Sequence, residues 1–252
     1  MEKIKLGIQL FSLRKYLKKP EDVRGVFEKC KALGAEVVQV SGMCPMDSRE
    51  LNKISKETEL PICITHSSFD RIVGDIDKLA EEHLTFNCKN IGIGMMPKKF
   101  RTGEAKDIFE FIEILNTAAE KLKAYDMKIA YHNHWFEFAK IDERIIMDML
   151  IENTLPEVQF IPDTFWIKVG GFEPTQYLEK MVGRVDTLHL KDYKKGLLFS
   201  AFKPVGYGSL DFKSILACAE NIGVKNAVVE LDFALNPYKA MDKSLKYLKT
   251  IY

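Results

Sequence analysis

Short runs of apolar residues alternate along the chain with longer stretches in which apolar positions recur at helical spacing. The short runs predict eight strands, at residues 4–10, 37–40, 62–66, 90–96, 128–134, 158–162, 185–190 and 226–231. The longer stretches predict a helix after each strand, at residues 20–33, 47–58, 70–84, 104–125, 143–153, 174–181, 211–221 and 238–252. Local signals agree with this division, since Pro20 opens the first helix, Gly34 follows its end and Asp70 is placed to cap the third.

Eight strand–helix units in 252 residues have the number and length of a (βα)8 TIM barrel, an α/β fold. A doubly wound open sheet also alternates strands and helices, but its dinucleotide-binding form carries Gly-x-Gly-x-x-Gly after the first strand. Here Gly92-Ile93-Gly94 lies inside a predicted strand and lacks the third glycine. No linker or low-complexity segment interrupts the pattern. We therefore predict a single TIM-barrel catalytic domain over residues 1–252.

Composition narrows the classes of partner. Hydrophobic residues make up 46% and charged residues 29%, and the formal net charge is +1, so nothing favours nucleic acid or an anionic membrane. The start of the chain lacks a signal-peptide core, and no apolar stretch approaches the roughly 20 residues that span a bilayer. Five dispersed cysteines predict free buried thiols in a reducing compartment, at Cys30, Cys44, Cys63, Cys88 and Cys218. The expected location is the cytoplasm.

Polar and ionisable residues gather where the predicted strands end, which is the active-site end of a TIM barrel. They are Gln9, Gln39, His66, His132, Asp163, His189 and Glu230. One such residue is more often a satisfied core polar group than a ligand, but seven at the ends of seven strands are more than packing explains. Buried groups of both signs need a shared counter-charge, and a divalent cation supplies one.

The stretch around the fifth strand concentrates this chemistry. Side chains alternate along a strand, so His132 and His134 are predicted to point the same way and Asn133 the other, with Glu137 three residues on. The alternative is a pair of hydrogen-bonded core histidines with an exposed glutamate. Carboxylates with imidazole suit Mn²⁺, Co²⁺ or Mg²⁺, and Zn²⁺ also fits, although a closed structural zinc site would use thiolates. Alternation also places Lys191 on the same face as His189, where it could act as an electrophile or anion anchor. The alternative is an exposed loop lysine.

At this point the motifs carry a resemblance. The segments, in chain order, are Gly-Ile-Gln-Leu-Phe-Ser-Leu-Arg from Gly7, Tyr-His-Asn-His from Tyr131, Asp-Thr-Phe-Trp from Asp163, Leu-His-Leu-Lys-Asp from Leu188, Val-Gly-Tyr-Gly-Ser-Leu-Asp from Val205 and Val-Glu-Leu-Asp from Val229. With these segments the chain resembles the xylose isomerase-like TIM-barrel superfamily, the sugar phosphate isomerase/epimerase family, over nearly its whole length.

The resemblance implies one divalent metal ion held by Asp163, His189 and Glu230 and by a ligand from the fifth strand. In the sugar epimerases that ligand is a glutamate at the strand end, whereas this chain has His132 there. Either His132 takes over the coordination or Glu137 swings back to do so. Since the two glutamates of the epimerases also form the acid/base pair, the departure argues against a simple two-glutamate epimerase mechanism.

The resemblance further implies an isomerase/epimerase-type enzyme that acts on a keto-sugar, keto-polyol or sugar phosphate through an enediolate. Glu230, or the pair His134 and Glu137, would move the proton, and Lys191 would stabilise the oxyanion. Substrate-binding residues are expected at Gln9, Gln39, His66 and Trp166. The alternative is a metal-dependent lyase or dehydratase of a keto-polyol or keto-glycoside, similar to inosose dehydratase. One base suffices for isomerisation or elimination, so these are favoured over C3 epimerisation of a free ketose.

Two other classes are weighed against this one. An endonuclease IV-like nucleic-acid enzyme needs a three-zinc cluster and a basic face, but the charge is balanced and one of the five histidines, His83, falls on a predicted helix. A non-catalytic binding protein would not be expected to keep all three matching metal ligands. The expected partner is a small-molecule carbohydrate, with no nucleic acid and no membrane; a homo-oligomer stays open.

Overall fold

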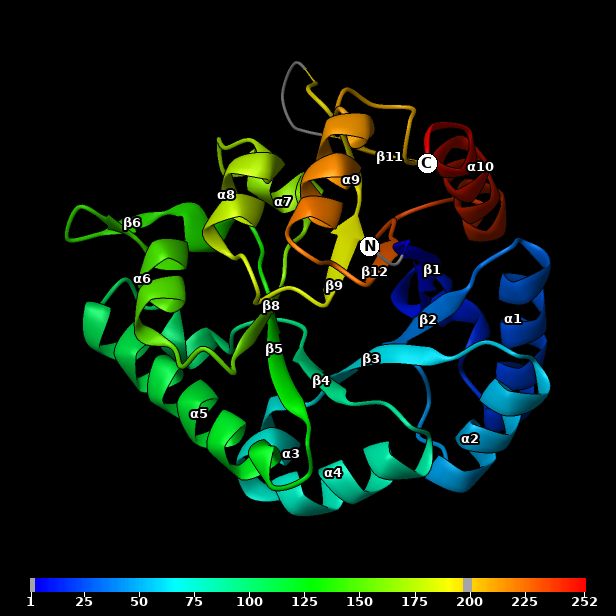
Figure 1. The fold of residues 1–252 in the computed structure, drawn as a ribbon, viewed down its shortest axis with the longest axis horizontal. Coiled ribbons are helices and arrows are strands. Elements are labelled where there is room, and N and C mark those ends of the chain that lie inside the picture. Colours follow the sequence, from blue (N-terminus) through cyan, green and yellow to red (C-terminus); the bar gives the residue numbers. More distant parts are fainter. Residues whose placement is uncertain (1–2, 197–200) are drawn as a thin grey trace.

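The computed structural model describes residues 3–196 and 201–252. Eight parallel strands curl around a common centre and helices surround them (Figure 1). In chain order the strands are β1 (Lys5–Gln9), β2 (Val37–Val40), β3 (Ile62–Ser67), β4 (Asn90–Ile93), β5 (Lys128–His132), β8 (Gln159–Ile161), β9 (Thr187–Leu190) and β12 (Asn226–Val229). They pair in the order β8-β5-β4-β3-β2-β1-β12-β9. The predicted single-domain TIM barrel is confirmed.

The barrel closes between β8 and β9 through a single parallel bridge, between Asp163 and His189, in the part of the chain that the structure describes. Strand β8 is short because Pro162, which follows it, has no N–H to donate. The carbonyl oxygen of Pro162 accepts a hydrogen bond from the His189 N–H at 2.9 Å. The seam of the barrel therefore lies at two of the predicted metal ligands.

Ten α-helices cover the barrel in the described ranges. They are α1 (Pro20–Ala32), α2 (Ser48–Glu57), α3 (Phe69–Gly74), α4 (Ile76–Thr85), α5 (Ala105–Lys123), α6 (Ile146–Asn153), α7 (Thr164–Val169), α8 (Pro174–Lys180), α9 (Phe212–Asn221) and α10 (Pro237–Ile251). Two short antiparallel hairpins, β6 (Lys140–Ile141) with β7 (Arg144–Ile145) and β10 (Asp192–Lys194) with β11 (Ala201–Lys203), extend the loops. Three 3₁₀ helices follow strands, η1 (Leu10–Tyr16), η2 (Lys98–Phe100) and η3 (Phe136–Phe138).

The predicted third helix is wrong in two respects. It is two helices, because Asp75 leaves the helical conformation at φ −148° between α3 and α4. The N-cap is Ser68, and Asp70 lies inside the first turn of α3, where its charge favours the helix N-terminus but caps nothing. Helix α7 was not predicted at all, because it is only six residues long and has no room for an apolar repeat.

The main core lies between the barrel and its helices, and a small second cluster of Ile64, Ala130 and Ile161 fills the barrel interior. Above this cluster the interior becomes polar. A Cβ on Gly94 would lie 2.9 Å from Nδ1 of His66, so glycine at this position leaves room for the imidazole. The apolar plug thus ends where the predicted site begins.

All five cysteines are free, as predicted, although only Cys30 and Cys88 are buried and the other three are half-buried. Burial raises the pKa of the Cys30 thiol to about 12, so it stays protonated and unreactive. None of the helices within the described ranges is both long and apolar enough to cross a membrane.

Candidate metal centre

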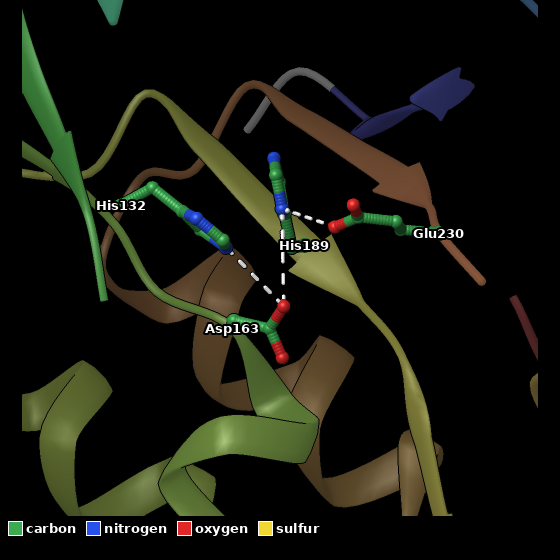
Figure 2. A group of neighbouring side chains, drawn as sticks. All are labelled: His132, Asp163, His189 and Glu230. Carbon is green, nitrogen blue, oxygen red and sulfur yellow. Dashed lines mark hydrogen bonds and ion pairs between the residues drawn. The ribbon is translucent and has the colours of Figure 1, made fainter. Parts of the chain in front are cut away.

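Four side chains converge at the C-terminal end of the barrel (Figure 2). His132 ends β5, Asp163 follows β8, His189 lies in β9 and Glu230 follows β12. One ligand atom from each lies within 4.8 Å of all the others, and all four residues are buried. These strands are neighbours around the barrel, so the fold itself brings the four residues together.

Both imidazoles are held by a bond on the side away from the centre. Nδ1 of His132 donates to the Gly94 carbonyl oxygen at 3.0 Å, and Nε2 of His189 donates to Oε1 of Gln39 at 2.6 Å. In the neutral rings, the remaining nitrogens therefore present lone pairs to the centre. Metal-ligating histidines are oriented in this way, with the other ring N–H given to a carbonyl group.

The inward-facing nitrogens meet carboxylate oxygens rather than donors. Nε2 of His132 lies 3.2 Å from Oδ2 of Asp163, and Nδ1 of His189 lies 2.9 Å from Oε2 of Glu230. Despite that short distance, the His189 and Glu230 atoms are not aligned for a hydrogen bond, and both are buried without a hydrogen-bond partner in the described part of the chain. Two lone pairs this close repel unless a cation or proton lies between them. The donor set therefore fits a divalent metal ion.

Asp163 divides its two oxygens between structure and site. Oδ1 caps α7, accepting from the backbone N–H of Phe165 at 2.9 Å and of Trp166 at 3.1 Å, which leaves Oδ2 directed to the centre. The Asp163 N–H donates to Oδ1 of Asn133 at 2.9 Å, while the rings of His132 and His134 lie 4.8 Å apart on the other side. The two imidazoles lie together as predicted, although β5 ends at His132 and the predicted strand over residues 128–134 is two residues too long.

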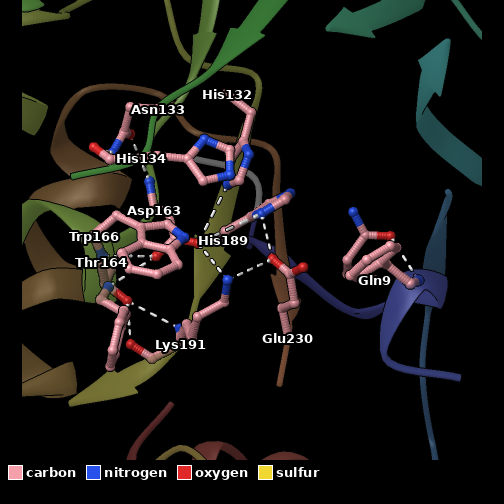
Figure 3. A network of polar contacts seen from close by, with 12 residues as sticks. Gln9, His132, Asn133, His134, Asp163, Thr164, Trp166, His189, Lys191 and Glu230 are labelled. Atoms are coloured by element: carbon pink, nitrogen blue, oxygen red, sulfur yellow. Dashed lines mark hydrogen bonds and ion pairs between the residues drawn. The ribbon is translucent and has the colours of Figure 1, made fainter. Parts of the chain in front are cut away.

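Lys191 points inward, so the exposed-loop alternative is wrong (Figure 3). Its Nζ lies 3.0 Å from Oδ2 of Asp163, 3.2 Å from Oε2 of Glu230 and 3.2 Å from Oδ2 of Asp232. Burial alone would lower the pKa of the ammonium, but the three carboxylates raise it above its usual value. Lys191 therefore brings a fixed positive charge to the same oxygens that face the centre.

The carboxyl groups divide according to their neighbours. Burial would raise the pKa of Asp163 and of Glu230, but the Lys191 ammonium and the adjacent histidines hold both below their usual values. Burial raises the pKa of Asp232 to about 6. The Lys191 ammonium lowers this pKa, but the negative charges of Glu230 and Asp163 help to raise it. Asp163 and Glu230 are thus the ionised pair, and Asp232 is the one of these three carboxyl groups that is nearest to titration at neutral pH.

His66 and His134 stay neutral. Burial, followed by the charge of His132, lowers the pKa of His134 to about 2 and holds that of His66 well below its usual value. An imidazole that is neutral at pH 7 has no imidazolium proton to give, which argues against His134 as the group that gives a proton to the substrate. Nδ1 of His134 and Nε2 of His66 are buried without a partner in the described residues, so both remain free to bond a ligand.

Glu137 lies outside the four-residue group. It is fully buried, its carboxylate accepts from the Tyr131 hydroxyl and from the His134 N–H at 2.8 Å, and it does not line the cavity over the centre. The structure thus brings His132, and not Glu137, to the fifth-strand position of the centre. Burial outweighs these two bonds and raises the pKa of Glu137 to about 7.

This raised pKa predicts a dependence of stability on pH. Between pH 4.5 and about 7 the unfolded chain loses the Glu137 proton while the folded protein keeps it, so the free energy of unfolding falls as pH rises. The loss approaches about 3 kcal/mol above pH 7. Glu137→Gln keeps an acceptor for the His134 N–H and cannot ionise. Over the same pH range we therefore expect the free energy of unfolding of this variant to fall by about 3 kcal/mol less than that of the parent.

The measurement is urea unfolding of the two proteins at about pH 4 and about pH 8. Glu28→Gln, at an exposed position on α1, is the control that should follow the parent. Parallel curves for Glu137→Gln and the parent would show that Glu137 is already ionised in the folded state.

A cavity of about 660 Å³ opens directly above the centre, lined by His132, Lys191 and Glu230 at its floor. His66 and Trp166 line it as the sequence predicted, but Gln9 and Gln39 do not. Oε1 of Gln9 caps η1 through the Phe11 N–H at 3.1 Å, and Gln39 holds His189. Gln39 therefore supports a ligand from behind and Gln9 supports the turn after β1, and that the two contact substrate stays a prediction.

Other cavity residues were missed from the sequence. Asp232 and Arg14 line the cavity, and each follows the end of a strand. They are the last residues of the motifs Val-Glu-Leu-Asp and Gly-Ile-Gln-Leu-Phe-Ser-Leu-Arg, and this position is the sequence feature that could have identified them. Arg14 donates to the carbonyl oxygens of Phe11 at 2.8 Å and Asp232 at 2.9 Å. It therefore ties the first and last strand loops together across the cavity wall.

Comparison with known proteins agrees with the barrel fold. A family model described as xylose isomerase-like TIM barrel matches residues 27–251, and the chain belongs to this family. Among curated proteins it is similar to an inosose dehydratase of Clostridium perfringens, 28% identical over 158 residues, which cover 54% of this chain and 52% of the relative. The chain thus spans about half the length of the curated relatives it matches.

Solved structures extend the similarity to the whole fold. A sugar phosphate isomerase/epimerase from Parabacteroides distasonis has a TM-score of 0.81 at 21% identity, covering 99% of this chain and 94% of that one. The IOLI protein with a bound zinc atom has a TM-score of 0.75 at 13% identity, covering 98% of each chain. At these identities the likeness establishes the fold. The match to the family model confirms the resemblance drawn from the sequence motifs.

Proposed function

We propose that the protein is a divalent-metal-dependent enzyme that acts on a keto-sugar or keto-polyol by moving the proton next to its carbonyl group. The observation that carries this proposal is the convergence of His132, Asp163, His189 and Glu230, with both imidazoles already oriented from behind. The zinc atom in the IOLI protein supports it. The reaction and substrate are proposals, since the curated relatives are matched over only half their length.

The four converging residues would hold the ion. Two imidazoles with two carboxylates favour Mn²⁺, Co²⁺ or Zn²⁺ over Mg²⁺, which prefers oxygen ligands. Bound there, the ion would polarise a substrate carbonyl and make the adjacent C–H more acidic.

The chain's own groups then divide the remaining work. Lys191, buried and permanently charged, is placed to stabilise negative charge that develops on a substrate oxygen. Asp232 lines the cavity, lies outside the four-ligand group and is hydrogen-bonded to Lys191, so it is free to take or give a proton. Glu230 would serve as the base only by leaving part of its role as a ligand. His66 and His134 offer unpaired nitrogens to substrate hydroxyls.

Two reactions begin with that proton transfer. Elimination of water or a glycoside is supported by the inosose dehydratase relatives. Isomerisation is the second candidate, supported by the Parabacteroides distasonis structure. Epimerisation at C3 of a free ketose fits less well, because His132 replaces one of the two glutamates and the ionisable carboxylates at the cavity, Glu230 and Asp232, come from the same strand end. A nucleic-acid enzyme fits less well still, because four ligands are too few for a three-zinc cluster.

The test is incubation of the metal-loaded protein in D₂O with a ketohexose panel and an inosose, followed by NMR. We expect loss of the C–H signal next to the carbonyl, with an isomer or a dehydrated product, and we expect chelation to stop it. Metal-dependent C3 deuteration that yields the C3 epimer of the ketose would instead show a two-base epimerase.

A further inference from the structure

Both tryptophans of the chain, Trp135 and Trp166, lie at the cavity above the metal centre. Their ring centroids are 5.0 Å apart, and Trp135 is 48% exposed. Trp166 packs edge-on against Phe202, with ring centroids 5.6 Å apart. The Lys191 ammonium lies 5.4 Å from the centre of the Trp166 ring (Figure 3). One side of the cavity is therefore an aromatic wall that rises from the catalytic floor to solvent.

A second aromatic group lines the cavity from the other end of the chain. Phe11 follows β1 and Phe233 follows β12, and the Arg14 guanidinium lies 4.1 Å from the Phe11 ring and 5.9 Å from the Phe233 ring. Phe233 is 76% exposed. Strand β1 is four places from β5 in the eight-strand order, so the Phe11 loop and the Trp135 loop face each other across the barrel mouth.

Floor and mouth thus differ in chemistry. The floor carries Lys191, Asp232 and the unpaired nitrogens of His66 and His134, which suit hydroxyl and carbonyl oxygens. The mouth exposes large apolar side chains, and such exposed patches mark binding surfaces. The volume of about 660 Å³ lies in the middle of the range of sites for drug-sized ligands, roughly 300–1,000 Å³, and a free monosaccharide is too small to fill it.

We propose that the substrate is amphiphilic: a keto-sugar or keto-polyol that carries a flat apolar group, as in an aryl glycoside. The polar end binds at the floor, and the aromatic ring lies at the mouth between Trp135 and the Phe11–Phe233 side. Only the polar-end part of this proposal rests on the proposed function. The aromatic part rests on the side chains at the mouth of the cavity.

The experiment compares phenyl β-D-glucopyranoside with methyl β-D-glucopyranoside, which share the sugar and differ in the flat ring. Binding to the full-length protein is followed by intrinsic fluorescence, which reports on this cavity because it contains both tryptophans. We expect the phenyl glucoside to bind about 10-fold more tightly than the methyl glucoside, a difference typical of a ring buried against aromatic side chains. The titration is repeated with excess Zn²⁺ and with a chelator.

Two variants separate the mouth from the rest of the surface. Trp135→Ala should bring the ratio of the two affinities close to one, with Trp166 still reporting. Phe109→Ala removes an exposed aromatic ring on α5, outside the cavity, and should keep the parent's ratio. Circular dichroism of each variant checks that it folds.

Equal affinities of the parent for the two glucosides, or no binding of the phenyl glucoside up to about 10 mM, would overturn the proposal. The proposal would also be overturned if Trp135→Ala changed the molecular mass of the protein in solution. Such a change would show that a second copy of the chain covers the mouth of the cavity in the parent. The preference for the phenyl ring is measured with and without metal. If the preference is absent, that result does not count against the metal centre. Absence of metal binding, conversely, leaves the ring preference intact.

Discussion

Replacing Glu230 with alanine is expected to abolish retention of the metal ion and, with it, turnover. The variant leaves two imidazoles and one carboxylate at the centre, and the Lys191 ammonium, 3.0 Å from Oδ2 of Asp163, then competes for the last carboxylate oxygen. We expect the affinity for the ion to fall by roughly 10³-fold or more, about 4 kcal/mol. The measurement is elemental analysis after dialysis against a low, fixed concentration of Mn²⁺ or Zn²⁺.

Glu28→Ala on the exposed face of α1 is the control, because it removes a carboxylate of the same kind far from the centre in the sequence. It should retain metal as the parent does. If Glu230→Ala also binds the ion as tightly as the parent, Glu230 is not a ligand.

Replacing Lys191 with methionine should lower turnover by roughly 10²- to 10³-fold, the range typical of losing one charge-stabilising group. Methionine keeps an unbranched side chain beneath Trp166 and Phe202, so the wall above it should stay packed. Metal retention should stay the same or improve, since the ammonium no longer competes for the oxygens of Asp163 and Glu230. Steady-state kinetics and elemental analysis of one preparation give both quantities.

The two readouts together define the role of Lys191. Turnover that falls while metal is retained supports a role in the reaction. Full turnover would contradict that role, and a parallel loss of metal and turnover would show that Lys191 instead stabilises the centre.

The architecture could be predicted from the sequence because strand and helix periods repeat eight times with short connections. The same repetition located the site, since it placed polar residues such as His132, His189 and Glu230 at strand ends that the barrel must bring together. What the repeat could not describe were the segments after the strands. Helix α7 and the capping role of Asp163 depend on the backbone turn after Pro162, which has no apolar period to read.

The choice between His132 and Glu137 also lay beyond the sequence. Glu137 stands in η3, past the end of β5, and its direction is decided by a long-range packing choice that buries it against the Tyr131 hydroxyl. Gln9 and Gln39 show a second limit: a strand-end polar residue reads the same whether it contacts substrate or holds a ligand from behind. The structure supplies the partners that the sequence cannot, since Gln39 bonds His189 and Gln9 bonds the Phe11 N–H.

The most direct test of the metal centre is the number of metal ions per chain in the parent, His132→Ala and Glu137→Gln, measured together by elemental analysis after dialysis against Zn²⁺ or Mn²⁺. His132 lies in the converging group and Glu137 lies outside it, so we expect one ion in the parent and in Glu137→Gln, and a large loss in His132→Ala. A parent that binds no divalent ion, or a His132→Ala variant that keeps its ion while Glu137→Gln loses it, would contradict the proposed centre.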